Sequence, residues 1–510
     1  MNRWIMTYLL IVGSCLGLIG CPGPTPILPP APLLIDWYIL MPVKSLPNRA
    51  MPAANLGKRW ENTTEATSSF TVEAGSHIRS SGNARYNAGR FELPQLPDGT
   101  HDVEVIDSDE RRVFAQQVVS GTPTKRVVGG ELTNPNDLMW DSLEVIEVFR
   151  SITIPAGQEL KINPGVIVFL HAGVNIDVSG MLTINGAQKM PVVLLCDDPF
   201  GAWGGIYLEG GTANITDCLI TQGGGDDSRV FGHSQSQPVI GGVNATLTLR
   251  RTAIVANEGK AFGMTNAEVT LRYCLVQRCD TGGEFAACKV TIDDSWFYDM
   301  PDNDNIAVDD DNDALYFNGV RGSDTSYVTN SYFIKGKDDA IDHNGAILVV
   351  SDCQIDGFDN EGVAGSNANY LRVENCYISN CEQGIESGYG TPFVEVNHCT
   401  INGCDNGLRI GDEYVPPPAG RLNVRNTLSF GNRLHNVWSF DNAINGPVIG
   451  GIEISYSLVN DTIYNSNRGC ITGNPSLTEY GTLLLSPHQP GWKAGMDSLD
   501  MGRLYQWPSN

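Results

Sequence analysis

The sequence predicts an all-β chain dominated by a solenoid of parallel strands, preceded by a small β-sandwich-like domain. Three observations support this prediction. A motif centred on cysteine recurs every 23 residues, at Cys353, Cys376 and Cys399. The repeats contain short alternating segments without a 3.6-residue period, which excludes an array of helical hairpins. The 56 glycines among 510 residues, together with frequent Asn and Asp, favour many tight turns between strands.

Each repeat would form one coil, whose strands hydrogen-bond to the next coil at about 4.8 Å, the usual spacing of paired strands. Equivalent side chains would then stack into ladders, with small residues in tight corners and Val, Ile and Leu on flat faces. Related motifs occur around Cys218, Cys274 and Thr427. We expect most of the 13 cysteines to be buried thiols rather than disulfides.

The repeat region opens with Ser151-Ile152-Thr153-Ile154-Pro155-Ala156-Gly157, and its closing part contains Gly473-Asn474-Pro475-Ser476-Leu477. These segments resemble the right-handed parallel β-helix family, the architecture of pectate lyases and many bacterial surface proteins. The resemblance covers residues 142–505 and implies a right-handed parallel β-helix solenoid of about 13 coils. It says little about activity, because this fold carries many functions.

The N-terminus resembles an export signal. An apolar run follows Arg3 and ends at Leu18-Ile19-Gly20-Cys21, which resembles the bacterial lipoprotein signal. The resemblance implies removal of residues 1–20 and acylation of Cys21. The protein would then be attached to a membrane of the bacterial cell envelope through a lipid anchor, facing the periplasm or the exterior. An ordinary secretory signal is the alternative. The Pro-rich linker 21–35 would act as an extended spacer.

Residues 36–128 lack the repeat. Residues 91–93 and 103–107 have the composition of strands and are separated by turn signals such as Pro97-Asp98-Gly99. We expect a small β-sandwich-like domain here. The alternative is an irregular cap, since an open solenoid needs its first edge shielded.

Charge excludes one class of partner. The chain has 33 Lys and Arg against 58 Asp and Glu, a net charge of -25. Proteins that bind a nucleic-acid backbone carry the opposite balance, so we expect no nucleic-acid partner. The sequence also lacks Gly-x-Ser-x-Gly, His-Glu-x-x-His, Cys-x-x-Cys and phosphate-loop motifs.

Acidic residues gather in the middle of the repeat region, and the repeat register predicts how they stack. One outward column on successive coils would contain Tyr316, Asp342, Ala364, Glu386 and Arg409. A second column, at the preceding turn, would contain Asp313, Asp339, Glu361 and Gln383. The two columns would bring several carboxylates onto one patch.

Carboxylates this close repel one another unless a cation or a proton lies between them. Oxygen ligands of this kind suit Ca²⁺, which is the candidate cofactor. The candidate metal ligands are Asp309, Asp311, Asp313 and Asp338, and the candidate binding residues are Glu361, Glu386 and Tyr316. The alternative is that these acids are solvated turn residues that keep the rod soluble.

The candidate catalytic residues are Asp339, Asp342, His343 and Arg409. In pectate-lyase-like enzymes Ca²⁺ neutralises a uronate carboxylate and a basic residue removes the α-proton; on this resemblance Arg409 or His343 would be the base. A glycoside hydrolase would instead use Asp339 with Asp342 or Glu386 as acid and base. We therefore expect a surface-anchored protein that binds or processes a polysaccharide, either acidic or cation-bridged. A non-catalytic structural or adhesive rod is the alternative.

Overall fold

The computed structural model describes most of the chain after residue 124 and six strands before it. The described ranges are 125–142, 144–187, 191–198, 201–255, 257–300, 312–411, 419–439, 451–461, 468–477 and 484–504, together with strands β1–β6. The predicted signal and Cys21 lie outside the described residues, so lipidation stays a prediction.

The six strands before residue 124 form two antiparallel groups. They are β1 (Leu33–Trp37), β2 (His77–Ser80), β3 (Arg85–Asn87), β4 (Arg90–Glu92), β5 (Gly99–Ile106) and β6 (Arg112–Ser120). Four of them make a sheet in the order β1-β6-β5-β2, while β3 and β4 make a hairpin. Strand β1 begins at Leu33, within the segment predicted as a linker. The β-sandwich-like domain over 36–128 stays a prediction.

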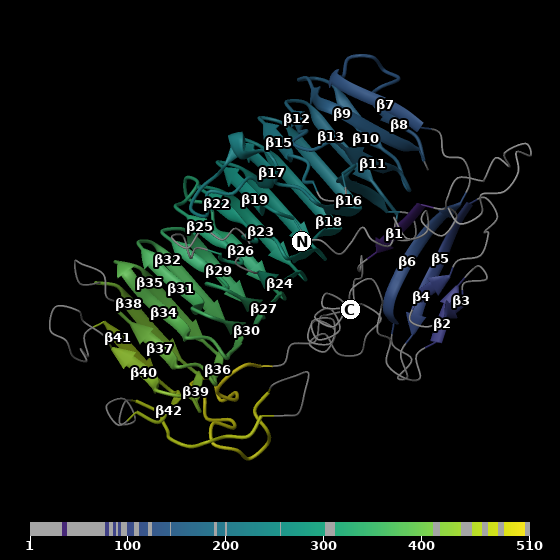
Figure 1. Ribbon diagram of the computed structural model, residues 1–510. Helices are drawn as coiled ribbons and strands as arrows, with labels where there is room; N and C mark the ends of the chain where they lie inside the picture. The colour runs from purple at the N-terminus through teal and green to yellow at the C-terminus, as the bar shows by residue number, and fades with distance from the viewer. Residues whose placement is uncertain are drawn as a thin grey trace, which may run out of the picture.

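From residue 125 onward the strands wind into a solenoid with three faces, here numbered 1 to 3 in chain order (Figure 1). Strands β7 (Lys125–Glu131) and β9 (Val145–Ile154) belong to the first two coils of the solenoid, and each runs from face 2 into face 3. Face 1 contains β8 (Met139–Trp140), β10 (Glu159–Ile162), β13 (Met181–Asn185), the first halves of β16 (Thr212–Thr221) and β18 (Thr246–Val255), β20 (Glu268–Arg272), β23 (Lys289–Asp293), β26 (Ser326–Thr329), β29 (Ile347–Ser351), β32 (Tyr370–Glu374), β35 (Phe393–Asn397), β38 (Arg421–Arg425) and β41 (Ile452–Ser455).

Faces 2 and 3 complete each coil. Face 2 contains β11 (Ile167–Leu170), β14 (Val192–Cys196), the second halves of β16 and β18, β21 (Leu275–Gln277), β24 (Trp296–Met300), β27 (Tyr332–Gly336), β30 (Gln354–Phe358), β33 (Tyr377–Ser379), β36 (Thr400–Asn402), β39 (Leu428–Phe430) and β42 (Leu458–Val459). Face 3 contains β12 (Ile176–Val178), β15 (Ile206–Glu209), β17 (Pro238–Val243), β19 (Lys260–Thr265), β22 (Glu284–Ala286), β25 (Tyr316–Asn318), β28 (Asp342–Asn344), β31 (Glu361–Asn367), β34 (Gln383–Gly390), β37 (Asn406–Ile410) and β40 (His435–Ser439).

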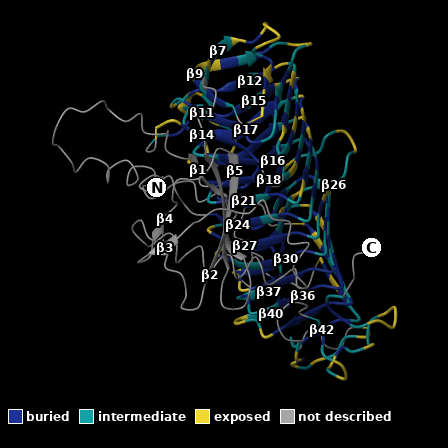
Figure 2. Cartoon of the chain, turned by 90° about the vertical axis from the view of Figure 1, so that its right-hand side faces the viewer, coloured by how far each residue is buried: buried dark blue, intermediate teal, exposed yellow. Residues whose placement is uncertain are grey.

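The pairing confirms the predicted parallel β-helix. Each strand pairs in parallel with the equivalent strand one coil later, as β29, β32 and β35 do on face 1. Pairing also begins before the predicted start at residue 142, because β7 already pairs in parallel with β9. Figure 2 shows buried residues along the length of the solenoid, with exposed residues at the loops.

Alternation along each strand builds the core. On β32, Leu371 and Val373 are buried while the residues between and beside them are partly exposed. Successive coils repeat the pattern, so apolar side chains stack in the interior; the rings of Phe297 and Phe333, for example, stack with centroids 5.0 Å apart. Such stacking removes apolar surface from water along the whole solenoid.

The cysteine ladder forms as predicted. Cys353, Cys376 and Cys399 have no exposed surface and stand one coil apart, since the residue after each continues the β30-β33-β36 register. All eleven cysteines among the described residues are free thiols. The residue before each ladder cysteine has a positive φ, at Asp352, Asn375 and His398. Asn, Asp and His tolerate this left-handed conformation better than most residues, which explains why the motif pairs them with a small side chain.

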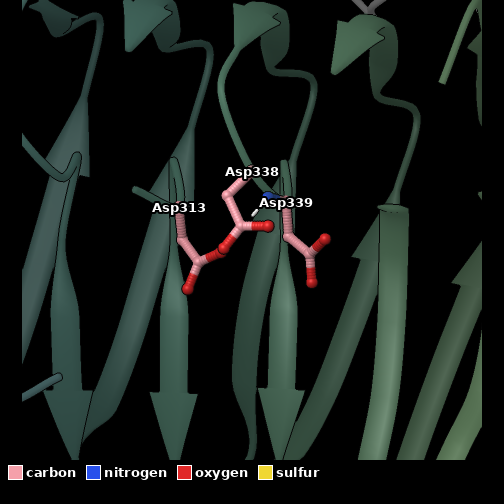
Figure 3. Close-up of side chains that lie close together, drawn as sticks. All are labelled: Asp313, Asp338 and Asp339. Carbon is pink, nitrogen blue, oxygen red and sulfur yellow. Dashed lines mark hydrogen bonds between the residues drawn. The ribbon is translucent and has the colours of Figure 1, made fainter. Parts of the chain in front are cut away.

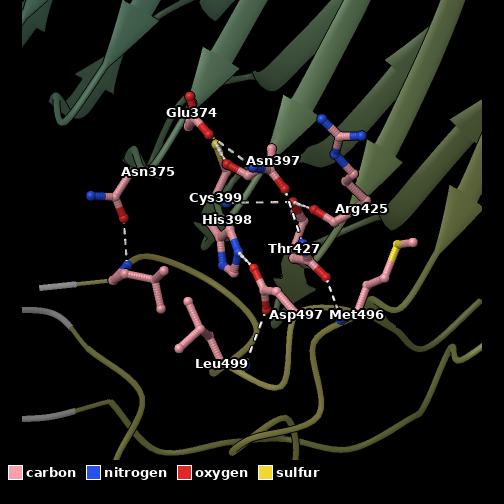
Figure 4. A network of polar contacts seen from close by, with 12 residues as sticks. Glu374, Asn375, Asn397, His398, Cys399, Arg425, Thr427, Met496, Asp497 and Leu499 are labelled. Atoms are coloured by element: carbon pink, nitrogen blue, oxygen red, sulfur yellow. Dashed lines mark hydrogen bonds and ion pairs between the residues drawn. The ribbon is translucent and has the colours of Figure 1, made fainter.

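A closing segment, residues 484–504, packs along the last coils (Figure 4). Its backbone N–H groups at Met496 and Leu504 donate to the side chains of Asn426 and Asn375. Asp497 lies 2.8 Å from Nε2 of His398. The segment therefore crosses three coils at the left-handed corner. Within the described residues, no helix has the length and apolar character needed to cross a membrane.

Candidate functional site

The outward column predicted from the repeats is confirmed on face 3. Backbone register pairs Tyr316 with Asp342, Asp342 with Ala364, Ala364 with Glu386, and Glu386 with Arg409. The four steps span about 19 Å at the usual strand spacing. We call these five residues the face 3 column.

The second predicted column, at the turn before face 3, is also confirmed. Asp313, Asp339, Glu361 and Gln383 follow one another on successive coils and are all buried. The N–H of Asp339 donates to Oδ1 of Asp313 at 3.2 Å, and the N–H of Glu361 donates to Oδ1 of Asp339 at 2.7 Å. Each of these two carboxylates thus supports the next coil. We call this set the turn row.

Three carboxylates meet where the turn row passes Asp338 (Figure 3). Asp313, Asp338 and Asp339 each offer an oxygen, and these oxygens lie within 4.8 Å of one another. Burial raises the pKa of Asp339 well above its usual range, and the charges of Glu361, Asp313 and Asp338 raise it further. The group is therefore suited to hold either a proton or a cation. Two of its members, Asp313 and Asp338, are predicted metal ligands; Asp309 and Asp311 lie outside the described residues.

At the other end of the face 3 column, Arg409 and Glu386 form an ion pair. Nη1 of Arg409 lies 3.4 Å from Oε2 of Glu386, and its Nε donates to the carbonyl of Gly411. The side chain of Glu386 is only 5% exposed. A guanidinium keeps its proton in proteins, so this arrangement suits Arg409 to bind a carboxylate rather than to act as a base.

His343 does not belong to the site. Its neighbours on β28, Asp342 and Asn344, are partly exposed, whereas His343 has no exposed surface and its Nε2 lies 2.6 Å from the carbonyl of Ala346. Burial lowers its pKa, favouring the neutral ring. The expectation that His343 acts as a base on the outer face is therefore corrected: alternation along the strand turns its side chain into the core.

Tyr316 is at the correct position but is covered. Its side chain is buried, and its hydroxyl accepts a hydrogen bond from Nδ2 of Asn344. The ring of His233 stacks on it, with centroids 5.1 Å apart and planes 11° from parallel. Burial raises the pKa of Tyr316 to about 12. Its predicted role as an open binding surface is therefore corrected, because a loop residue occupies one face of the ring.

Sequence reasoning missed Lys260, Glu284 and His233. The turn row extends back through Thr281 to Lys260, whose Nζ lies 3.0 Å from Oε2 of Glu284 in a buried ion pair. Glu284 pairs in register with Tyr316 and so continues the face 3 column. Extending the repeat alignment two coils toward the N-terminus would have revealed Lys260 and Glu284. No sequence signal placed His233 there.

Comparison with known proteins supports the fold. Residues 204–414 match the family model described as a right handed beta helix region, so the solenoid has the predicted hand. No curated protein matches the sequence. Among solved structures, the periplasmic alginate epimerase AlgG is 10% identical with a TM-score of 0.35, over 69% of this chain and 86% of that chain.

Two further solved structures resemble the chain at the same level. The PL6 family alginate lyase AlyGC is 11% identical with a TM-score of 0.35, over 68% of this chain and 57% of that chain. The catalytic domain of a GH87 α-1,3-glucanase is 13% identical with a TM-score of 0.33, over 72% of this chain and 78% of that chain. Likeness at this level says nothing about function, which has to be argued from the site.

Proposed function

We propose that this protein binds a polysaccharide on face 3, between Asp342 and Arg409, and acts on it there. The observation that supports the proposal is that the face 3 column and the turn row place charged residues side by side on the same successive coils. In the face 3 column, Asp342 and Arg409 are partly exposed and buried Glu386 pairs with Arg409; the buried turn-row carboxylates precede this column on the same coils. Few soluble rods would concentrate so many buried charges in one place for solubility alone, because burying charge is costly.

An acidic or cation-bridged polysaccharide fits this chemistry best. The guanidinium of Arg409 can receive a uronate carboxylate in a planar, two-pronged geometry. The partly exposed carboxylate of Asp342 can accept hydrogen bonds from sugar hydroxyls, while buried Glu386 orients Arg409. Asp342 and Arg409 stand three coils apart on the same face, which suits an extended ligand.

Calcium is the cofactor we propose for this site. Asp313, Asp338 and Asp339 would hold it, since their oxygens already lie within 4.8 Å of one another and hard oxygen donors suit Ca²⁺. A bound Ca²⁺ would supply positive charge to a sugar carboxylate. Without it, the raised pKa of Asp339 favours the protonated carboxyl, the form that a general acid needs. Cation and proton thus compete for one carboxylate.

The test is a panel of polysaccharides with and without Ca²⁺. Alginate, polygalacturonate and neutral glucans are offered to the purified protein in Ca²⁺ and in EDTA, and both binding and new chain ends are measured. Asp342→Ala should weaken binding at least tenfold, the effect expected for loss of one charged hydrogen bond. Asp359→Asn, an exposed substitution in a neighbouring turn, is the control. Binding that is absent in the native protein, or unchanged by Asp342→Ala, would refute the proposal.

One observation favours a second candidate, a non-catalytic adhesive rod. Asp313 and Asp339 accept backbone N–H groups from the next coil, which is a structural role for a buried acid. On this reading the protein binds glycan or cell surface without altering it. Retained glycan binding with no new chain ends, in the native protein and in an Asp339→Asn variant alike, would select this candidate over an enzyme.

We also propose that the protein resides in the bacterial cell envelope, attached by a lipid on Cys21. The support is the resemblance of the segment ending at Cys21 to a lipoprotein signal. Labelling with a palmitate analogue in a bacterial host should mark the native protein and not a Cys21→Ser variant. Equal labelling of both would contradict the anchor and leave the site proposal untouched.

A further inference from the structure

The connection between β16 and β17, residues 222–237, lies against the earlier coils of face 3, which continue the face 3 column toward the N-terminus from Tyr316. It contains the 3-10 helix η2 (Asp227–Arg229). Register carries the column back from Tyr316 through Glu284, Gly263, Gly241 and Tyr207 to Asp177. The connection contacts this row of residues at its two ends, Asp177 and Tyr316, and at Gly263 and Glu284 between them. We call it the 222–237 loop.

The loop begins over Asp177 and Tyr207. Nη1 of Arg229 donates to Oδ1 of Asp177 at 2.5 Å, and its guanidinium lies over the ring of Tyr207, 5.2 Å from the centroid. Asp226 accepts a hydrogen bond from Nδ2 of Asn175 at 2.6 Å. These bonds fix the first part of the loop to β12 and β15.

The middle of the loop lies on Gly263. A Cβ at Gly263 would lie 2.3 Å from Cγ of Pro238 and 2.9 Å from Cδ1 of Phe231. A side chain there would therefore displace the loop. The absence of a side chain at Gly263 is what lets the Phe231 ring approach the strands.

A buried ion pair anchors the far end. Nζ of Lys260 donates to the carbonyl of Phe231 at 2.5 Å and lies 3.0 Å from Oε2 of Glu284. Oε1 of Glu284 accepts the N–H groups of His233 at 2.8 Å and Ser234 at 3.2 Å. A charge pair with this many hydrogen bonds is held in one geometry, and removing one partner alone would leave a buried charge uncompensated.

The loop contacts described here end at Tyr316, where His233 stacks on the ring. His233 itself is exposed, whereas Tyr316 is buried beneath it. The next members of the column, Asp342 and Ala364, are partly exposed. Among the described residues, the column is thus covered up to Tyr316 and is partly exposed at Asp342, Ala364 and Arg409, while Glu386 is buried.

From this arrangement we infer that the 222–237 loop forms an end wall of the glycan site, so that the site receives the end of a polysaccharide chain rather than its interior. The inference rests on the proposed function and adds how the substrate enters. A chain lying along the column from Arg409 would meet His233 after about four strand spacings and could not continue over the loop.

The probes are alginate and polygalacturonate, each prepared at two mean chain lengths that differ tenfold. For a chain-end binder, the mass concentration at half-saturation should fall about tenfold with the shorter preparation, because chain ends are the ligand. A variant that replaces residues 229–235 by a short Gly-Ser linker and carries Lys260→Met with Glu284→Gln removes the wall and both charges together. It should bind long and short preparations equally by mass.

A second variant, His233→Ala, keeps the Lys260–Glu284 anchor and uncovers only the Tyr316 ring. The shortest oligomer that gives full affinity should become one sugar longer. If the native protein binds both chain lengths equally by mass, the end wall is refuted while the proposed function stands. If neither probe binds and Asp342→Ala changes nothing, the proposed function fails and the inference fails with it.

Discussion

Replacing Asp339 by asparagine should change how stability depends on pH. The asparagine Oδ1 can still accept the N–H of Glu361, at 2.7 Å in the native protein, while its amide presents N–H donors to the neighbouring carboxylates. The native carboxyl has a pKa well above its usual range, because it is buried and lies beside Glu361, Asp313 and Asp338. The unfolded chain titrates near the ordinary value of about 3.9.

The sign and size of the change in native stability with pH follow from proton linkage. Between the unfolded and folded pKa values the folded state binds one more proton than the unfolded state, so native stability falls as pH rises. For one proton the slope is about 1.4 kcal/mol per pH unit. The stabilising contribution is complete below the unfolded pKa and is lost as pH rises through the folded pKa. Asp339→Asn lacks this titration and should be more stable than the native protein at the high end of the pH range.

Urea denaturation followed by tryptophan fluorescence, in EDTA and from about pH 3 to 8, measures the difference between the two proteins across a range that contains the unfolded pKa. Asp359→Asn is the matched control and should stay within about 0.5 kcal/mol of the native protein at every pH. A native-minus-variant difference that does not change with pH would refute the reasoning. Calcium affinity of the native protein should rise with pH over the same window, since the metal needs the ionised carboxylate.

Three other predictions concern the solenoid. Phe333→Ala removes a fully buried ring that stacks on Phe297, so urea denaturation should show a loss of about 3–5 kcal/mol. Burial acts to raise the pKa of Asp497, but hydrogen bonds, chiefly from His398, outweigh it and lower that pKa, so contacts of the closing segment should weaken as pH falls through the pKa of the folded state. Asp497→Asn should therefore show fast amide exchange in the closing segment at every pH. Equal exchange in the native protein and the variant would contradict this. Burial raises the pKa of the Cys274 thiol to about 12, so a thiol reagent should modify it only after unfolding; rapid modification of the native protein would contradict the buried ladder.

The predictable part of the structure was the part that repeats. A constant offset between similar segments fixed which residues share a column, and the register of Tyr316, Asp342, Glu386 and Arg409 follows from it. The same alternation rule places His343 in the core, although the sequence analysis did not apply it to that residue. Periodicity within one strand therefore determines the site as much as periodicity between coils does.

The 222–237 loop could not be predicted in the same way. It occurs once, so no second copy shows which residues of the loop meet which residues of the column. Its position depends on contacts between residues about 50 apart, such as Arg229 with Asp177 and His233 with Glu284. Side chains that meet across such separations leave no local pattern, and the cover over Tyr316 appears only in three dimensions.

The register of the face 3 column has a consequence for how such a protein can evolve. Asp342 and Glu386 stand two strand spacings apart, with Ala364 between them. Deleting or duplicating one whole coil would preserve the pairing of every remaining strand, yet it would move these two groups closer or further apart by a fixed increment of about 4.8 Å. The distance between the two carboxylates could thus be changed in discrete units by recombination, without a point mutation in either residue.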